Sequence, residues 1–122
     1  MELQKIELDF SVCKIKNIQQ VDFTREFVFL HKTPEEISLV CESACVPPDA
    51  ISVEASWKAL RISGQLEFGL IGIIARISKI LAEAQISIFV ISTYDTDYVL
   101  LKADDFNKGI QELARNGYTI QQ

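Results

Sequence analysis

The chain has few of the residues from which covalent or metal-held frameworks are made. Its 122 residues include one histidine and three cysteines, an odd number without the spacing of a disulfide framework. Cysteines of this kind are expected to stay reduced, as they do in the cytoplasm. Cys41, Cys45 and His31 together fall short of the four ligands of a closed zinc site, so we expect no metal. His31 is instead expected to be a structural imidazole in an apolar strand.

Motifs of catalysis are also missing. The histidine does not stand in a recognisable motif with a nucleophilic serine or cysteine, and no glycine-rich signature for phosphate binding occurs. We therefore expect no catalytic residue, no cofactor and a protein that is not an enzyme.

Long apolar runs and an excess of positive charge are both absent. Although 48% of the residues are hydrophobic, no uninterrupted apolar run approaches the about 18 residues of a membrane span. The net charge of -5 argues against nucleic acid as a partner, because phosphate binding requires a basic face. The N-terminal stretch alternates charged and apolar side chains and lacks the basic start and apolar run of a signal peptide. We expect a cytoplasmic protein whose partners include neither a membrane nor a nucleic acid.

The composition changes near residue 55. All five glycines lie after this point, whereas all three prolines and all three cysteines lie before it. We therefore expect two parts, residues 1–55 and residues 56–122. No Gly/Ser-rich spacer separates them, so we expect them to pack on each other without a flexible linker.

The second part shows the pattern of a β-α-β-β-α-β fold. Apolar residues recur at helical spacing from Leu70 to Ala84, with a strand expected before them at residues 57–62. Residues 86–93 are apolar on both faces, which predicts a strand that is covered on both sides. A polar hairpin over residues 92–97 should return the chain. A second helix over residues 104–116 and a strand over residues 118–120 complete an α+β, ferredoxin-like sandwich.

The ends of the second helix are marked by particular residues. Asp104 is expected to cap its N-terminus, and Gly117 stands where a helix is expected to stop.

The first part has strand patterns but little room for helices. Polar and apolar residues alternate over residues 6–12, and apolar stretches at 27–30 and 37–41 flank a turn at 33–36. We interpret this part as a degenerate, helix-poor copy of the second.

Three stretches resemble a known family: residues 86–101 (ISIFVISTYDTDYVLL), residues 33–40 (TPEEISLV) and residues 56–62 (SWKALRI). In order and spacing they resemble ACT domains, and most closely the short paired-ACT proteins and the N-terminal half of the CASTOR-type arginine sensors. The resemblance covers nearly the whole chain. It implies a ferredoxin-like ACT domain at residues 56–122 and a degenerate ACT-like half at residues 1–55, together a non-catalytic regulatory module that binds a small amino acid.

The resemblance also implies the composition of the ligand site. In the arginine sensors the ligand lies between two ACT modules, and this chain has only one of the C-terminal type, so a homodimer is expected. One subunit would supply the start of the strand after the first helix, and the other would supply the loop before that helix together with the polar hairpin. The residues transferred in this way are Ser87 and Ile88 from the first subunit, and Glu67, Gly69, Leu70, Ile71, Gly72, Thr93, Tyr94 and Asp97 from the second.

Each of these elements also has an ordinary structural interpretation. Gly69 and Gly72 flank a helix start without an obvious cap, which suits a carboxylate, but two glycines at a strand-to-helix turn suit a purely structural role in the backbone path equally well. Asp97 suits an ammonium or guanidinium group, and Thr93 suits the polar atoms of a ligand, unless the aspartates only shape the hairpin. Tyr94 suits the wall of a pocket, and Ser87 suits either an interface or a solvent-facing strand edge.

Two functional interpretations therefore remain from the sequence. One is an amino-acid sensor, whose specificity for arginine stays open because Glu67 is the only acid in the loop before the first helix. The other is a structural or protein-interaction dimerisation module with a vestigial pocket.

Overall fold

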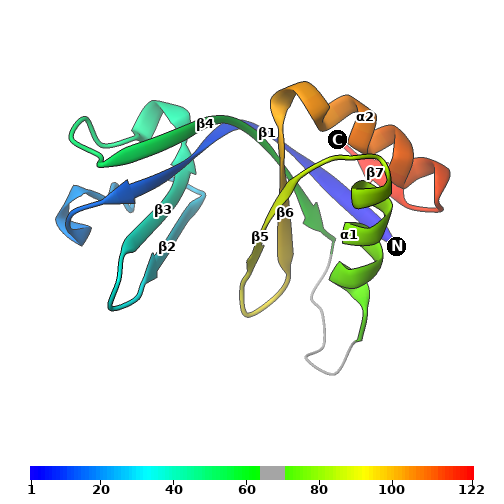
Figure 1. Ribbon diagram of the computed structural model, residues 1–122, viewed down its shortest axis with the longest axis horizontal. Coiled ribbons are helices and arrows are strands. Elements are labelled where there is room, and N and C mark those ends of the chain that lie inside the picture. Colours follow the sequence, from blue (N-terminus) through cyan, green and yellow to red (C-terminus); the bar gives the residue numbers. More distant parts are fainter. Residues whose placement is uncertain (64–70) are drawn as a thin grey trace. The chain divides into compact units, whose positions relative to one another are not determined.

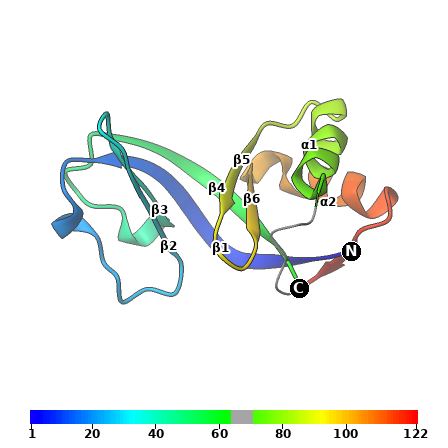
Figure 2. The same ribbon diagram turned by 90° about the horizontal axis from the view of Figure 1, so that it is seen from below.

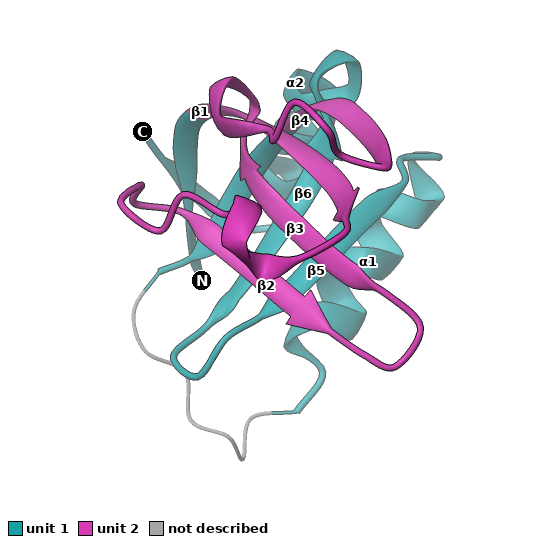
Figure 3. Cartoon of the chain, turned by 90° about the vertical axis from the view of Figure 1, so that its left-hand side faces the viewer, with its two compact units in different colours: residues 1–7, 58–122 teal, residues 8–57 magenta. Residues whose placement is uncertain are grey.

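The computed structural model describes residues 1–63 and 71–122, which form two compact units (Figure 3). Unit 1 comprises residues 1–7 and 58–122, and unit 2 comprises residues 8–57. The sequence predicted a single boundary after residue 55. In the structure the chain passes between the units twice, because the first seven residues belong with the C-terminal part.

Unit 1 contains the elements predicted for a β-α-β-β-α-β fold. They are β4 (Ser52–Ile62), whose last residues lie in this unit, α1 (Ile73–Glu83), β5 (Ile88–Ser92), β6 (Asp97–Lys102), α2 (Ala103–Arg115) and β7 (Thr119–Gln121). Figures 1 and 2 show both helices on the same face of the sheet. The predicted α+β class and element order are confirmed. Neither helix has the length and apolar character needed to cross a bilayer, as judged over the described residues.

The N-terminal strand is inserted into the sheet of this unit. In a plain ferredoxin-like sheet β7 would lie next to β4, whereas here β7 pairs in parallel with the start of β1 (Glu2–Ile15). β1 is in turn a neighbour of β4, where the Ser63 amide donates to the Glu2 carbonyl at 3.0 Å. Arg61 also donates to the side chain of Gln4. These bonds explain why residues 1–7 belong to this unit.

The core of unit 1 lies between the sheet and its two helices. It consists of Leu3, Leu60, Ile62, Ile77, Leu81, Ile86, Val99, Leu101, Phe106, Leu113 and Tyr118. The predicted apolar stripe of the first helix is confirmed, since Ile77 and Leu81 are fully buried and Ile73, Ile74, Ile80 and Ala84 pack against the same core.

Both helices end in a left-handed residue. Gly117 follows α2 with a φ of 97°, and the next amide, that of Tyr118, donates to the Leu113 carbonyl at 3.1 Å. The helix stop predicted at Gly117 is therefore confirmed. Gln85 takes the same place after α1 with a φ of 62°, and the Ile86 amide donates to the Leu81 carbonyl at 2.9 Å.

The predicted cap of the second helix is wrong. α2 begins at Ala103, its N-cap is Lys102 and no side chain caps it. β6 runs into the helix without a loop, so Asp104 and Asp105 fall inside the first turn. There their carboxylates interact favourably with the positive end of the helix dipole instead of serving as caps.

The prediction that both faces of β5 are covered is also wrong. Ile91 is buried, but 36% of the surface of Val90 is exposed. β5 pairs with β6 and is the last strand of this part of the sheet, with no partner on its other side among residues 1–63 and 71–122. An apolar strand therefore lies at the edge of the sheet. The hydrophobicity of a strand does not by itself reveal whether the strand is central or at an edge.

Unit 2 is built from strands and two single-turn 3-10 helices, Ile18–Gln20 and Ser43–Cys45. Residues 10–15 of β1 pair with β3 (Ile37–Glu42), and β3 pairs with β2 (Val28–Lys32). The predicted turn at residues 33–36 joins β2 and β3, where the Thr33 amide donates to the Glu36 carbonyl at 2.9 Å. His31 lies on a strand as predicted, β2, and its side chain is exposed.

Candidate functional site

The polar hairpin between β5 and β6 is fastened by its two threonines. The Thr93 amide and hydroxyl both donate to the Thr96 carbonyl, at 2.8 and 3.0 Å, and the Thr96 amide donates to the Thr93 hydroxyl oxygen at 3.3 Å. The hydroxyl of Thr96, whose side chain is buried, donates to the Ile62 carbonyl at 2.9 Å. The two threonines thus shape the turn. In the structural alternative considered from the sequence, the aspartates of the hairpin were expected to have this role. Thr96 was not among the predicted site residues.

These bonds define what the predicted hairpin residues can offer a ligand. The hydroxyl of Thr93 already donates within the turn, so it has only acceptor capacity left. Tyr94 stands at the tip with 74% of its surface exposed. Asp97 is half-buried as the first residue of β6, paired in register with Ser92. Its carboxylate is therefore the group of this hairpin best suited to bind a cation.

The start of α1 is open to a ligand in the part that the structure describes. Gly72 is the N-cap with a φ of 81°, and it has no side chain that could occupy the first amides of the helix. Ile71 precedes it with 93% of its surface exposed. The first turn of a helix leaves amide donors without intrahelical partners, and these attract carboxylates. The predicted residues Glu67, Gly69 and Leu70 lie outside the described residues.

The hairpin and the end of β4 lie side by side in unit 1. The bond from Thr96 to the Ile62 carbonyl joins them directly, and residue 62 stands shortly before the segment that leads to Gly72. The predicted residues Ser87 and Ile88, in contrast, lie at the opposite end of β5 from Thr93. At about 3.3 Å per residue, Ile88 and Thr93 are about 17 Å apart along the strand. A single copy of unit 1 therefore does not bring Ser87 and Ile88 together with the hairpin.

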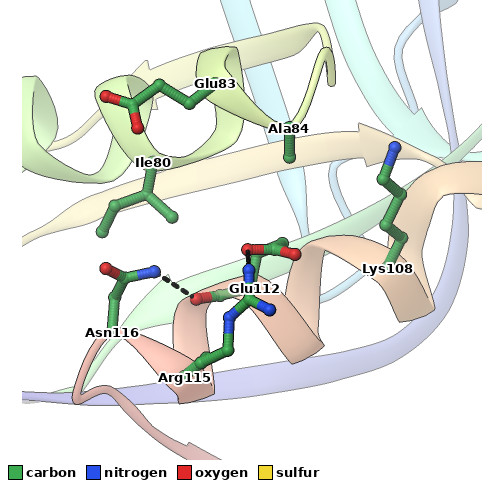
Figure 4. Close-up of a pocket in the computed structure, with 7 residues that line it drawn as sticks. All are labelled: Ile80, Glu83, Ala84, Lys108, Glu112, Arg115 and Asn116. Carbon is green, nitrogen blue, oxygen red and sulfur yellow. Dashed lines mark hydrogen bonds and ion pairs between the residues drawn. The ribbon is translucent and has the colours of Figure 1, made fainter.

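A separate groove of about 390 Å³ lies between the two helices of unit 1 (Figure 4). It is lined by Ile80 and Glu83 of α1 with Ala84 directly after this helix, and by Lys108, Glu112 and Arg115 of α2 with Asn116 directly after it. No residue of this groove was predicted as a site residue. Its lining residues come from two helices that only packing brings side by side, so the sequence carries no signal for it.

The three thiols of the chain come together in unit 2. Cys13 and Cys41 are buried on the paired strands β1 and β3, and Cys45 packs against them. Burial raises the pKa of Cys41 to about 12, with a further contribution from the neighbouring thiols. Burial also raises the pKa of Cys13. Among the described residues, His, Cys, Asp and Glu side chains form no group of three that could hold a metal ion.

Comparison with known protein families assigns the second half of the chain to one of them. Residues 52–115, more than half of the chain, match the model of the ACT domain. The cytosolic arginine sensor for mTORC1 subunit 1 of Homo sapiens is 38% identical over 73 residues, which are 57% of this chain and 22% of the sensor. The chain thus spans less than a third of the length of this curated relative.

Solved structures agree with the fold. A protein of Agobacterium tumefaciens superimposes with a TM-score of 0.86 at 26% sequence identity, covering 98% of this chain and 90% of that one. Aspartate kinase of Clostridium acetobutylicum, described as an allosteric enzyme, superimposes with a TM-score of 0.64 at 14% identity. That match covers 92% of this chain and 32% of the kinase, and at this identity it shows the fold alone.

Proposed function

We propose that this chain, which belongs to the ACT domain family, is a non-catalytic regulatory module that binds a small amino acid between two copies of itself. One observation carries the proposal: the hairpin of the predicted site lies at the opposite end of β5 from Ser87 and Ile88, and β5 is an edge strand without a second partner among the described residues. Two copies paired along this edge would bring the two parts together.

The hydrogen bonds of the hairpin determine which groups of β5 point outward. The Thr93 amide points toward β6, because it donates to the Thr96 carbonyl. Backbone groups alternate in direction along a strand, so the amides and carbonyls of Ile88, Val90 and Ser92 point away from β6. Within the part of the chain that the structure describes, these three residues therefore present the unpaired hydrogen-bonding edge.

This edge is complementary to itself in an antiparallel arrangement. If a two-fold axis passes by Val90, Val90 of one copy pairs with Val90 of the other, and Ile88 of each pairs with Ser92 of the other. About six backbone hydrogen bonds would form. In the same register Ser87 of one copy lies directly opposite Thr93 of the other. The two parts of the predicted site would then meet twice, once on each side of the axis.

The chemistry of the combined site suits a zwitterion with a second cationic group. The open amides at the start of α1 would take the carboxylate, and Asp97 would take the cationic end. Arginine is the first ligand to test, because the curated relative is described as an arginine sensor. Ligand that bridges two copies stabilises the dimer and thereby passes the signal to a partner.

Thermal unfolding in the presence of single amino acids tests ligand binding. A ligand at about 100 times its dissociation constant adds about 2.7 kcal/mol, or roughly 10 °C for a chain of this size. Asp97→Asn should abolish the shift, whereas the matched variant Asp95→Asn, in the same hairpin, should retain it. A panel of twenty amino acids without any shift would contradict the proposal.

Disulfide trapping tests the interface separately. Residues of a hydrogen-bonded antiparallel pair have Cα atoms about 5.5 Å apart, within the range of a disulfide. Val90→Cys in a Cys45→Ser background should therefore form a covalent dimer upon mild oxidation. Val53→Cys, whose site is 46% exposed in unit 2, is the control and should form none. If Val90→Cys also fails while ligand binding persists, the dimer uses another face.

The second interpretation, a protein-interaction module with a vestigial pocket, has one observation in its favour. The hydroxyl of Thr93 is engaged within its own turn and cannot donate to a ligand at the same time. This interpretation predicts that the Val90→Cys dimer forms but that no amino acid shifts its stability.

A further inference from the structure

The groove between α1 and α2 has the size of a small-ligand site, and its lining is mostly polar. Its volume of about 390 Å³ lies in the range of pockets that hold small molecules. It is formed entirely within unit 1, by the last turn of α1 and the second half of α2. It is distinct from the hairpin and from the start of α1, where the amino acid of the proposed function would bind.

The centre of the groove is electrically balanced. Arg115 and Glu112 form an ion pair at 2.6 Å, and the amide of the Asn116 side chain donates to the Glu112 carbonyl at 2.8 Å. Ile80 and Ala84 of α1 face these groups with apolar surface (Figure 4). The middle of the groove therefore accepts an uncharged segment of a ligand.

The ends of the groove carry charges of opposite sign. Lys108 on α2 and Glu83 on α1 have no ion-pair partner among the residues that the structure describes. Figure 4 shows their side chains toward opposite ends of the groove, with Lys108 near Ala84 and Glu83 on the side of Ile80. The last carbonyls of α1 do not need the Lys108 ammonium group as a hydrogen-bond donor. Backbone amides already donate to the carbonyls of Ile80, Leu81 and Ala82.

We propose that this groove is a second ligand site, for a linear zwitterion whose carboxylate binds Lys108 and whose cationic group binds Glu83, with its methylene chain over Ile80 and Ala84. ω-Amino acids, extended basic amino acids and short peptides share this chemistry. A ligand with charge of one sign only would leave one end unsatisfied, so both charges are required for the best fit.

The test uses ε-aminocaproate as the probe, followed by amide shifts in nuclear magnetic resonance spectra of the whole chain. Shifts are expected along residues 80–84 and 108–116. Caproate, which lacks the cation, and hexylamine, which lacks the carboxylate, should each bind about two- to five-fold more weakly, as for the loss of one exposed ion pair. γ-Aminobutyrate and L-lysine then show which spacing and which class of zwitterion the groove prefers.

Two variants connect the probe to its contacts. In the Lys108→Gln variant, ε-aminocaproate should no longer bind more tightly than hexylamine. In the Glu83→Gln variant, it should no longer bind more tightly than caproate. Lys79→Gln and Glu36→Gln, both exposed and outside the groove, should leave these advantages unchanged.

The proposal is overturned if the probe causes no shifts, if the shifts centre on residues 92–97, or if caproate and hexylamine bind as well as the zwitterion. Asp97→Asn separates the two sites, because it should abolish the amino-acid response of the proposed function and leave the groove intact.

Discussion

The Thr96→Val substitution tests whether the hairpin depends on its bond to β4. Valine keeps the branched shape of threonine but removes the hydroxyl that donates to the Ile62 carbonyl at 2.9 Å. Thr96 is only 7% exposed and Ile62 only 1%, so water has little access to replace the bond.

The expected loss follows from two opposing terms. A buried carbonyl that loses its partner destabilises the fold by about 1–3 kcal/mol. Burying a methyl group in place of the hydroxyl returns up to about 0.8 kcal/mol. We therefore expect the free energy of unfolding to fall by about 1–2 kcal/mol, which lowers the melting temperature by roughly 4–8 °C.

Urea unfolding followed by circular dichroism measures this loss. The midpoint should fall while the slope of the unfolding free energy against urea stays the same, because the surface exposed on unfolding does not change. Thr119→Val, on the exposed surface of β7, is the control and should stay within about 0.5 kcal/mol of the parent. A Thr96→Val protein as stable as the parent would refute the view that this bond fastens the hairpin.

Three further changes address the helix ends and the thiols. Gln85→Gly should stabilise the fold by about 0.5–1 kcal/mol in urea unfolding, because Gln85 adopts a φ of 62° that glycine takes without strain. Gly117→Ala, at a φ of 97°, should have the opposite effect by about 1 kcal/mol, and equal stability of both variants with the parent would contradict this account. Burial raises the pKa of Cys41 from 9.0 to about 12, so the folded state favours the protonated thiol. This preference contributes to the free energy of unfolding. The contribution is complete below about pH 9 and is lost as the pH rises toward 12. Alkaline unfolding of Cys41→Ala should lack this component, and the native thiol should react slowly with a disulfide reagent at neutral pH and readily after unfolding.

Much of unit 1 was predictable because its signals are local. The apolar stripe of α1 is set by helical periodicity, and the stop at Gly117 requires only that one residue take a left-handed conformation. The cap of α2 was not predictable, since Asp104 has the right side chain but the helix begins one residue earlier, directly from β6. Gln85 was missed for a similar reason, because its residue type gives no signal for the left-handed conformation that it adopts.

The candidate site was predictable only in part. The sequence pointed to the hairpin and to Asp97, but not to Thr96, whose importance comes from a bond to a carbonyl 34 residues away. Nor could it indicate the groove of the two helices, because Glu83 and Lys108 belong to helices that only packing brings side by side.

The sequence by itself determined the element order of unit 1 and its family, because periodicity, turn residues and motif spacing are properties of neighbouring residues. Only the tertiary structure decided that residues 1–7 insert between β7 and β4, and that the apolar strand β5 lies at an edge. Both depend on which strands pair across long stretches of chain. Such pairing reflects the hydrogen-bonding needs of the whole sheet, and no single segment carries this information.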